Sequence, residues 1–83
     1  MEDILNILRN EARSSASMYG EYLYEKWSHE DWIRVLRGAA EDRTYGSLPL
    51  GMPQDEVQEA VRIAQDVAES AYRSEVARLK TCR

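Results

Sequence analysis

The sequence predicts an all-α protein, folded as a small antiparallel three-helix bundle. Three observations favour this fold class. Apolar residues recur at three- and four-residue steps along three segments, Phe is absent and β-branched residues are few, and no stretch alternates as a strand would. The 83 residues suffice for one domain, residues 1–83, with a small core. Short connections between consecutive helices favour antiparallel neighbours.

The first helix is expected over about residues 2–26. Its apolar stripe consists of Ile4, Leu5, Leu8, Ala12, Ala16, Tyr19, Tyr22, Leu23 and Trp27. The middle of this segment, Ser14–Ser17, has small side chains and weak helix propensity, and Gly20 follows it. This composition predicts a place where a neighbouring helix approaches closely. It also leaves open a kink near residues 14–20.

The second helix is expected over about residues 28–44, and its start carries the best local signal in the chain. Ser28 is a preferred N-cap residue, and acidic residues in the following turn complement the helix dipole. Asp31 holds the position where a capping box usually has Glu or Gln, so an imperfect box is expected. Trp27 and Trp32 have the spacing of a hydrophobic staple.

The rest of the second helix has a buried stripe and a charged face. The stripe consists of Trp32, Ile33, Leu36, Ala39 and Ala40. On the charged face, four-residue spacing predicts the ion pairs Glu30–Arg34 and Arg37–Glu41. The helix is expected to end near residues 43–45, with Gly46 as its C-terminal cap.

A loop is expected over residues 46–52, because Gly and Pro are concentrated there, and a third helix over about residues 53–79. Pro53 suits a first helical position. The apolar face consists of Val57, Ala60, Val61, Ala64, Val67, Ala68, Ala71, Tyr72 and Leu79. Glu69 and Arg73 have the spacing of an ion pair. Glu75 and Arg78 interrupt the apolar face, so the last turns are expected to project or fray.

The charge balance and the single cysteine exclude several classes of protein. A formal net charge of −4, from 15 acidic and 11 basic residues, excludes a generally basic nucleic-acid binder, and no direct nucleic-acid binding is expected. No apolar run approaches the roughly 18 residues of a membrane span, and the first residues are acidic where a signal peptide is basic. Because Cys82 is the only cysteine, a reducing compartment is expected, either the cytoplasm or a host cytoplasm.

The sequence offers no convergent catalytic chemistry. His29, the only histidine, is expected to be exposed at a helix start and has no evident nucleophile beside it. Cys82 is similarly isolated, and one His with one Cys cannot build a structural zinc site. We therefore expect no catalytic residues, no cofactor and no metal.

Two groups of residues are candidates for contact with a partner. Helical spacing turns Tyr24 away from the apolar stripe, beside Glu21 and Glu25. The loop supplies the second group, Leu48, Leu50 and Met52. These three either fold back to cap the open end of the bundle or remain exposed as an anchor stiffened by proline.

These observations predict a small acidic protein without enzymatic activity that binds and inhibits or modulates a larger protein or ribonucleoprotein complex. Phage-encoded inhibitors, anti-CRISPR proteins among them, share these general properties. No motif of this sequence is specific to them. In one variant the acidic flank imitates a phosphate backbone. The alternative is a self-associating structural or regulatory subunit, because the small residues Ala60, Ala64, Ala68 and Ala71 permit close helix approach. A monomer favours the first hypothesis, and a homodimer the second.

Overall fold

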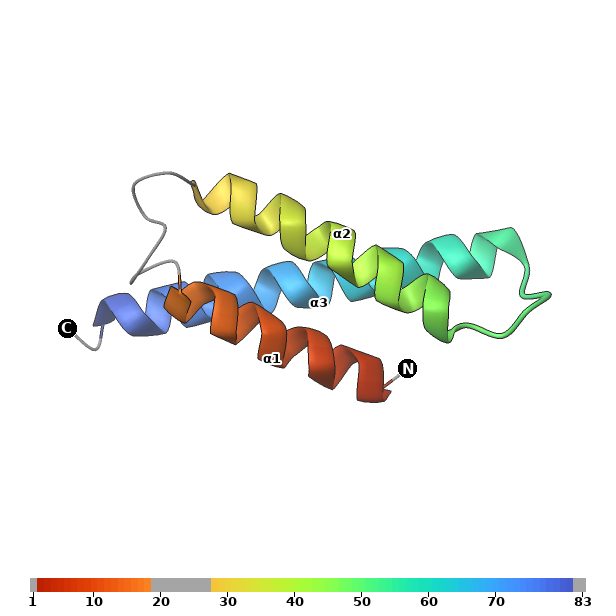
Figure 1. The fold of residues 1–83 in the computed structure, drawn as a ribbon, viewed down its shortest axis with the longest axis horizontal. Helices are drawn as coiled ribbons and strands as arrows, with labels where there is room; N and C mark the ends of the chain where they lie inside the picture. Colours follow the sequence, from red (N-terminus) through yellow and green to blue (C-terminus); the bar gives the residue numbers. More distant parts are fainter. Residues whose placement is uncertain (1, 19–27, 82–83) are drawn as a thin grey trace.

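The computed structural model describes residues 2–18 and 28–81. Within these residues three helices form an antiparallel bundle, as the sequence predicts. Helix α1 spans Glu2–Met18, α2 spans His29–Ser47 and α3 spans Gln54–Thr81. Figure 1 shows that α2 runs opposite to α1 and α3, which run in the same direction. The long helix α3 packs against both other helices, whereas α1 and α2 contact each other least.

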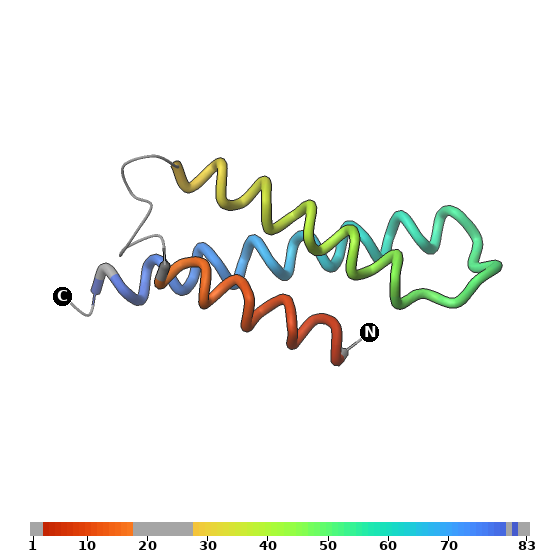
Figure 2. Tube along the Cα trace, viewed as in Figure 1, coloured from red at the N-terminus to blue at the C-terminus, as the bar shows by residue number. Residues whose placement is uncertain are grey.

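The core lies where the predicted apolar stripes of the three helices meet. Each helix contributes three of its buried members: Leu8, Ala12 and Ala16 from α1, Ile33, Leu36 and Ala40 from α2, and Ala64, Ala68 and Tyr72 from α3. Five of the nine are alanines, so the backbones approach closely. The larger side chains Ile4, Leu5, Trp32, Val76 and Leu79 pack around this centre. The Cα trace in Figure 2 shows α1 and α2 lying along α3.

Helix α1 remains helical through Met18, so its weak middle does not interrupt it up to that residue. Ala16 is buried there, as expected for a packing position. The expected continuation to residue 26, including Gly20, lies outside the described residues, as does Trp27 of the expected staple.

The start of α2 has a complete capping box, which corrects the expectation of an imperfect one. The Ser28 hydroxyl accepts a hydrogen bond from the Asp31 backbone N–H at 3.2 Å. In return the Asp31 carboxylate accepts one from the Ser28 backbone N–H at 3.1 Å. The shorter aspartate side chain therefore reaches back as a glutamate would.

The end of α2 lies later than the predicted end near residues 43–45. The helix continues through Gly46 to Ser47, and the cap is Leu48, whose backbone N–H donates to the Thr44 carbonyl oxygen at 3.1 Å. Gly46 is not the cap, because it lies inside the helix and the cap residue Leu48 has an extended backbone. The described glycine with a left-handed conformation is Gly51, with φ 85°. The connection is consequently shorter than predicted and lies over residues 48–53.

Helix α3 starts one residue later and ends two residues later than predicted. The Pro53 carbonyl oxygen accepts the Val57 backbone N–H at 3.1 Å, so Pro53 stands at the entrance of the helix. The expected fraying around Glu75 and Arg78 is not seen: the two side chains form an ion pair, and Val76 and Leu79 pack on the core. The ion pair removes the conflict that the two charges pose in the sequence.

Candidate functional site: the end of the bundle at the α2–α3 loop

The α2–α3 loop divides the three apolar residues that the sequence singled out. Leu48 and Met52 are half-buried, whereas Leu50 has a relative exposure of 102%. The backbone positions Leu50 at the tip, because Gly51 adopts a positive φ of 85° directly after it. Pro49 and Pro53 restrict the backbone on either side. The three residues thus differ: Leu48 and Met52 are partly shielded from solvent, and Leu50 is exposed.

Tyr45 is a second exposed apolar side chain near the loop, and the sequence pattern does not indicate it. It lies in the last turn of α2 with 48% of its surface exposed. Its hydroxyl accepts a hydrogen bond from the Gln58 side chain of α3 at 3.3 Å. The prediction that α2 stops near this residue obscured its position. A helix extended to Ser47 would have placed it on the outer face.

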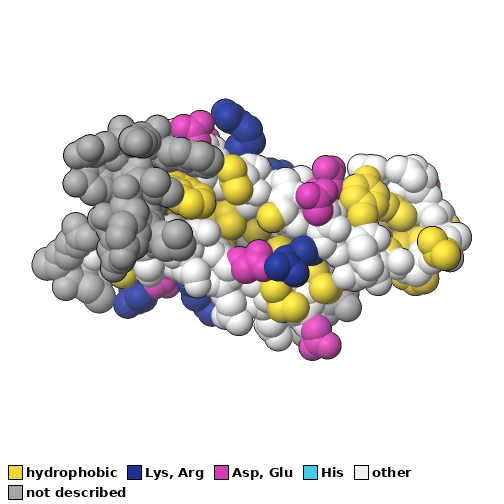
Figure 3. Space-filling model, viewed as in Figure 1, with side chains coloured by type: hydrophobic (Ala, Val, Ile, Leu, Met, Phe, Trp, Pro, Cys, Tyr) yellow, Lys and Arg dark blue, Asp and Glu magenta, His cyan; other side chains and the backbone are white. Residues whose placement is uncertain are grey.

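Carboxylates surround this end of the molecule. The last turns of α2 and the first turn of α3 lie at this end, and α1 begins in the same half of the molecule, short of the loop (Figure 1). Within residues 2–18 and 28–81, five exposed carboxylates of this half form no ion pair: Asp3, Glu41, Asp42, Asp55 and Glu56. We call Tyr45, Leu50, Asp42, Asp55 and Glu56 the loop-end surface. In Figure 3 apolar side chains are visible at the surface of this end.

The other predicted contact group, Glu21, Tyr24 and Glu25, lies outside the described residues. Its role as a partner surface stays a prediction.

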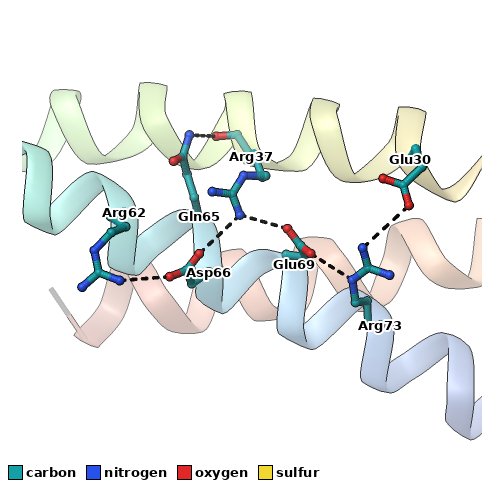
Figure 4. Close-up of polar contacts among 7 residues, drawn as sticks. All are labelled: Glu30, Arg37, Arg62, Gln65, Asp66, Glu69 and Arg73. Carbon is teal, nitrogen blue, oxygen red and sulfur yellow. Dashed lines mark hydrogen bonds and ion pairs between the residues drawn. The ribbon is translucent and has the colours of Figure 1, made fainter.

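A chain of ion pairs along α2 and α3 uses the charges of a different face (Figure 4). Arg37 of α2 reaches across to Glu69 at 2.9 Å and to Asp66 at 3.3 Å. Asp66 also contacts Arg62 at 3.3 Å. Glu69 also contacts Arg73 at 2.9 Å, which confirms the predicted Glu69–Arg73 pair. These charges hold the two helices together, so this face has little free charge for a partner.

The two ion pairs predicted within α2 are replaced by others. Arg34 contacts Asp31 at 3.4 Å rather than Glu30. Glu30 instead lies 3.8 Å from Arg73 of α3. The Arg37 side chain contacts α3 instead. The Gln65 side chain of α3 donates a hydrogen bond to the backbone carbonyl oxygen of Arg37 at 3.1 Å. Packing against a second helix offers these side chains partners that spacing within one helix cannot reveal.

The ion pairs hold the pKa of Glu69 below its usual value. The hydrogen bond from Arg73 is the largest cause, and the hydrogen bond from Arg37 acts in the same direction against partial desolvation. The pKa of Asp31 is lowered as well, first by the hydrogen bond from the Ser28 backbone. Both carboxylates are therefore ionised near neutral pH and serve the structure.

His29 is half-buried, which corrects the expectation of an exposed side chain. Its Nδ1 lies 2.7 Å from the hydroxyl of Tyr72, a residue with 1% exposure. The two rings also meet edge to face, with centroids 5.7 Å apart. The contact gives the buried tyrosine hydroxyl a polar partner, which explains the histidine structurally.

The remaining negative findings hold for the residues that the structure describes. There, no group of three His, Cys, Asp or Glu side chains could hold a metal ion. None of the three helices, as far as they are described, has an apolar stretch that could span a bilayer.

The small residues of α3 are largely used inside the bundle. Ala64 and Ala68 are fully buried against α1 and α2, and Ala60 and Ala71 are half-buried. The stripe that would serve a homodimer is thus occupied by the protein's own helices.

Comparison with known protein families, with characterised proteins and with solved structures finds no match for this chain.

Proposed function

We propose that this protein has no enzymatic activity and acts by binding a larger protein or ribonucleoprotein complex, which it inhibits or modulates. The loop-end surface makes the contact. The observation that carries the proposal is the full exposure of Leu50 at the tip of a loop between two prolines. A leucine in this position contributes nothing to the core, whereas burial against a partner would remove its apolar surface from water.

The shape of the loop supports an anchoring role. A segment restrained by Pro49, Pro53 and the turn at Gly51 loses less conformational freedom on binding than a flexible loop does. Leu48 and Met52, on either side of the tip, are half-buried and therefore partly shielded from water in the free protein. Tyr45 adds an aromatic ring next to the loop, and tyrosine is enriched among residues that dominate binding energy.

The carboxylates around the loop favour a partner surface that carries Lys or Arg. Asp42, Asp55 and Glu56 form no ion pair with the described residues, so their charge is available to a partner. Such charges accelerate association with a basic surface, and added salt weakens this association by screening the attraction. The proposal therefore combines an apolar anchor with a screened electrostatic contribution.

Affinity capture from a lysate of the cell in which the protein acts tests the proposal. The lysate is treated with nuclease. The tagged native protein is then compared with the variants Leu50→Ser and Val35→Ser. Val35 is the matched control, because it is an exposed apolar residue in the middle of α2, at 46% exposure. We expect a stoichiometric complex with the native protein and with Val35→Ser, and its loss with Leu50→Ser.

The activity of the captured complex, measured with and without added protein, tests inhibition or modulation separately. Retention of the same complex by Leu50→Ser would contradict the loop-end surface. Recovery of the protein alone, as a dimer in solution, would contradict the binding function and favour the self-associating subunit.

A further inference from the structure

A polar groove lies between α1 and α3, apart from the loop-end surface. Its volume is about 470 Å³, and its lining includes Arg9, Arg13, Ser70, Ser74, Glu75 and Arg78. Because α1 and α3 run in the same direction, two rows of side chains spaced four residues apart face each other across it. Arg9 and Arg13 form the row on α1.

The carboxylates of the groove are already engaged by arginines. Glu75 forms an ion pair with Arg78, and only 13% of the Glu75 side chain is exposed. The hydrogen bond from Arg78 lowers the pKa of Glu75, and the charge of Arg13 acts in the same direction. Asp66, at the other end of the groove, contacts Arg37 and Arg62.

The groove consequently has more hydrogen-bond donors than acceptors. In the part of the chain that the structure describes, Arg13 forms no ion pair and no hydrogen bond. The hydroxyls of Ser70 and Ser74 likewise make no hydrogen bond with described residues. Glu75 and Asp66 already contact arginines, whereas Arg13 forms no ion pair with the described residues, so its positive charge remains available in the groove.

We propose that this groove binds the phosphate group of a small ligand. Guanidinium groups match a tetrahedral oxyanion with paired, charge-assisted hydrogen bonds. The serine hydroxyls supply further donors on the opposite wall. Arg13 is the principal contact, with Ser70 and Ser74 closing the site from α3. This site is independent of the proposed partner surface, and either proposal can fail without the other.

Titration of the ¹⁵N-labelled protein with inorganic phosphate and with pyrophosphate tests the site, and sodium chloride at matched ionic strength serves as the control. We expect saturable shifts in the amide signals around Arg13, Ser70 and Ser74, and tighter binding of pyrophosphate because it carries more charge. Shifts that do not saturate, that chloride reproduces, or that centre elsewhere would overturn the proposal.

Two variants make the assignment specific. Arg13→Gln removes the principal charge and is expected to weaken pyrophosphate binding about tenfold, the loss of one hydrogen bond to a charged group. Arg34→Gln is the matched control, because Arg34 lies on α2 with 78% of its side chain exposed and should leave binding unchanged. Equal affinities in both variants would overturn the site. Substitution of Ser70 and Ser74 by Ala keeps every charge, and unchanged binding by that variant would remove the serines from it.

Discussion

At the scale of single residues, Ser28 fixes the start of α2. Its hydroxyl and the Asp31 carboxylate satisfy each other's backbone N–H groups. We expect Ser28→Ala to lower the free energy of unfolding by about 1 kcal/mol, the usual cost of losing an N-cap. Urea denaturation measures the change. Ser47→Ala, at the other end of the same helix, removes a hydroxyl that donates a hydrogen bond to the Arg43 carbonyl oxygen, and should change stability less. Equal losses would contradict the role given to the cap.

Glu69 makes stability depend on pH in a defined direction. Its pKa in the folded protein lies below the ordinary glutamate value of 4.5, because Arg73 and Arg37 donate hydrogen bonds to the ionised form. The stabilisation is therefore complete above 4.5 and is lost as the pH falls through the folded pKa. As the pH falls below 4.5, we expect the free energy of unfolding to decrease less steeply for Glu69→Gln than for the native protein. Denaturant titrations across this range measure it, and identical slopes would contradict the assignment.

At the scale of helices, the closeness of α3 to its neighbours depends on alanines. Ala68 has no exposed surface and lies where α1, α2 and α3 meet. We expect Ala68→Leu to destabilise the protein by about 1–3 kcal/mol, because extra methyl groups in a packed core force the helices apart. Ala77→Leu is the control on the same helix, at an exposed position. Thermal unfolding compares the two variants. If Ala68→Leu were as stable as the native protein, the core would be loosely packed.

Periodicity predicts the three helices and their buried faces because burial of an apolar stripe repeats with the helix itself. Leu8, Ile33 and Ala64 all lie where the pattern places them. The predicted end of α2 is wrong, because Gly46 suggests a cap that Leu48 in fact provides. The predicted partner of Arg37 is wrong as well, because spacing within one helix contains no information about α3. The exposure of Leu50 could be posed only as an alternative, since it depends on how the loop meets the bundle.

At the scale of the whole molecule, the two ends of the bundle differ in how their charges are paired. Carboxylates that form no ion pair with described residues gather toward the loop end, whereas in the second half of α3 Glu69 pairs with Arg73 and Glu75 pairs with Arg78. The alanine face of α3 is covered by the protein's own helices. We therefore expect a monomer at micromolar concentration. Sedimentation velocity measures this, and a stable dimer there would favour the self-associating alternative.

The central claim is that the protein binds its partner through the loop-end surface, and the most direct test is the affinity of the captured partner for three purified proteins. Calorimetry would compare the native chain, Leu50→Ser and Val35→Ser at two salt concentrations. We predict about a tenfold or greater loss for Leu50→Ser, as for an anchor residue. Val35→Ser should match the native protein, and affinity should fall with salt in both. Equal affinities for all three proteins would contradict the claim.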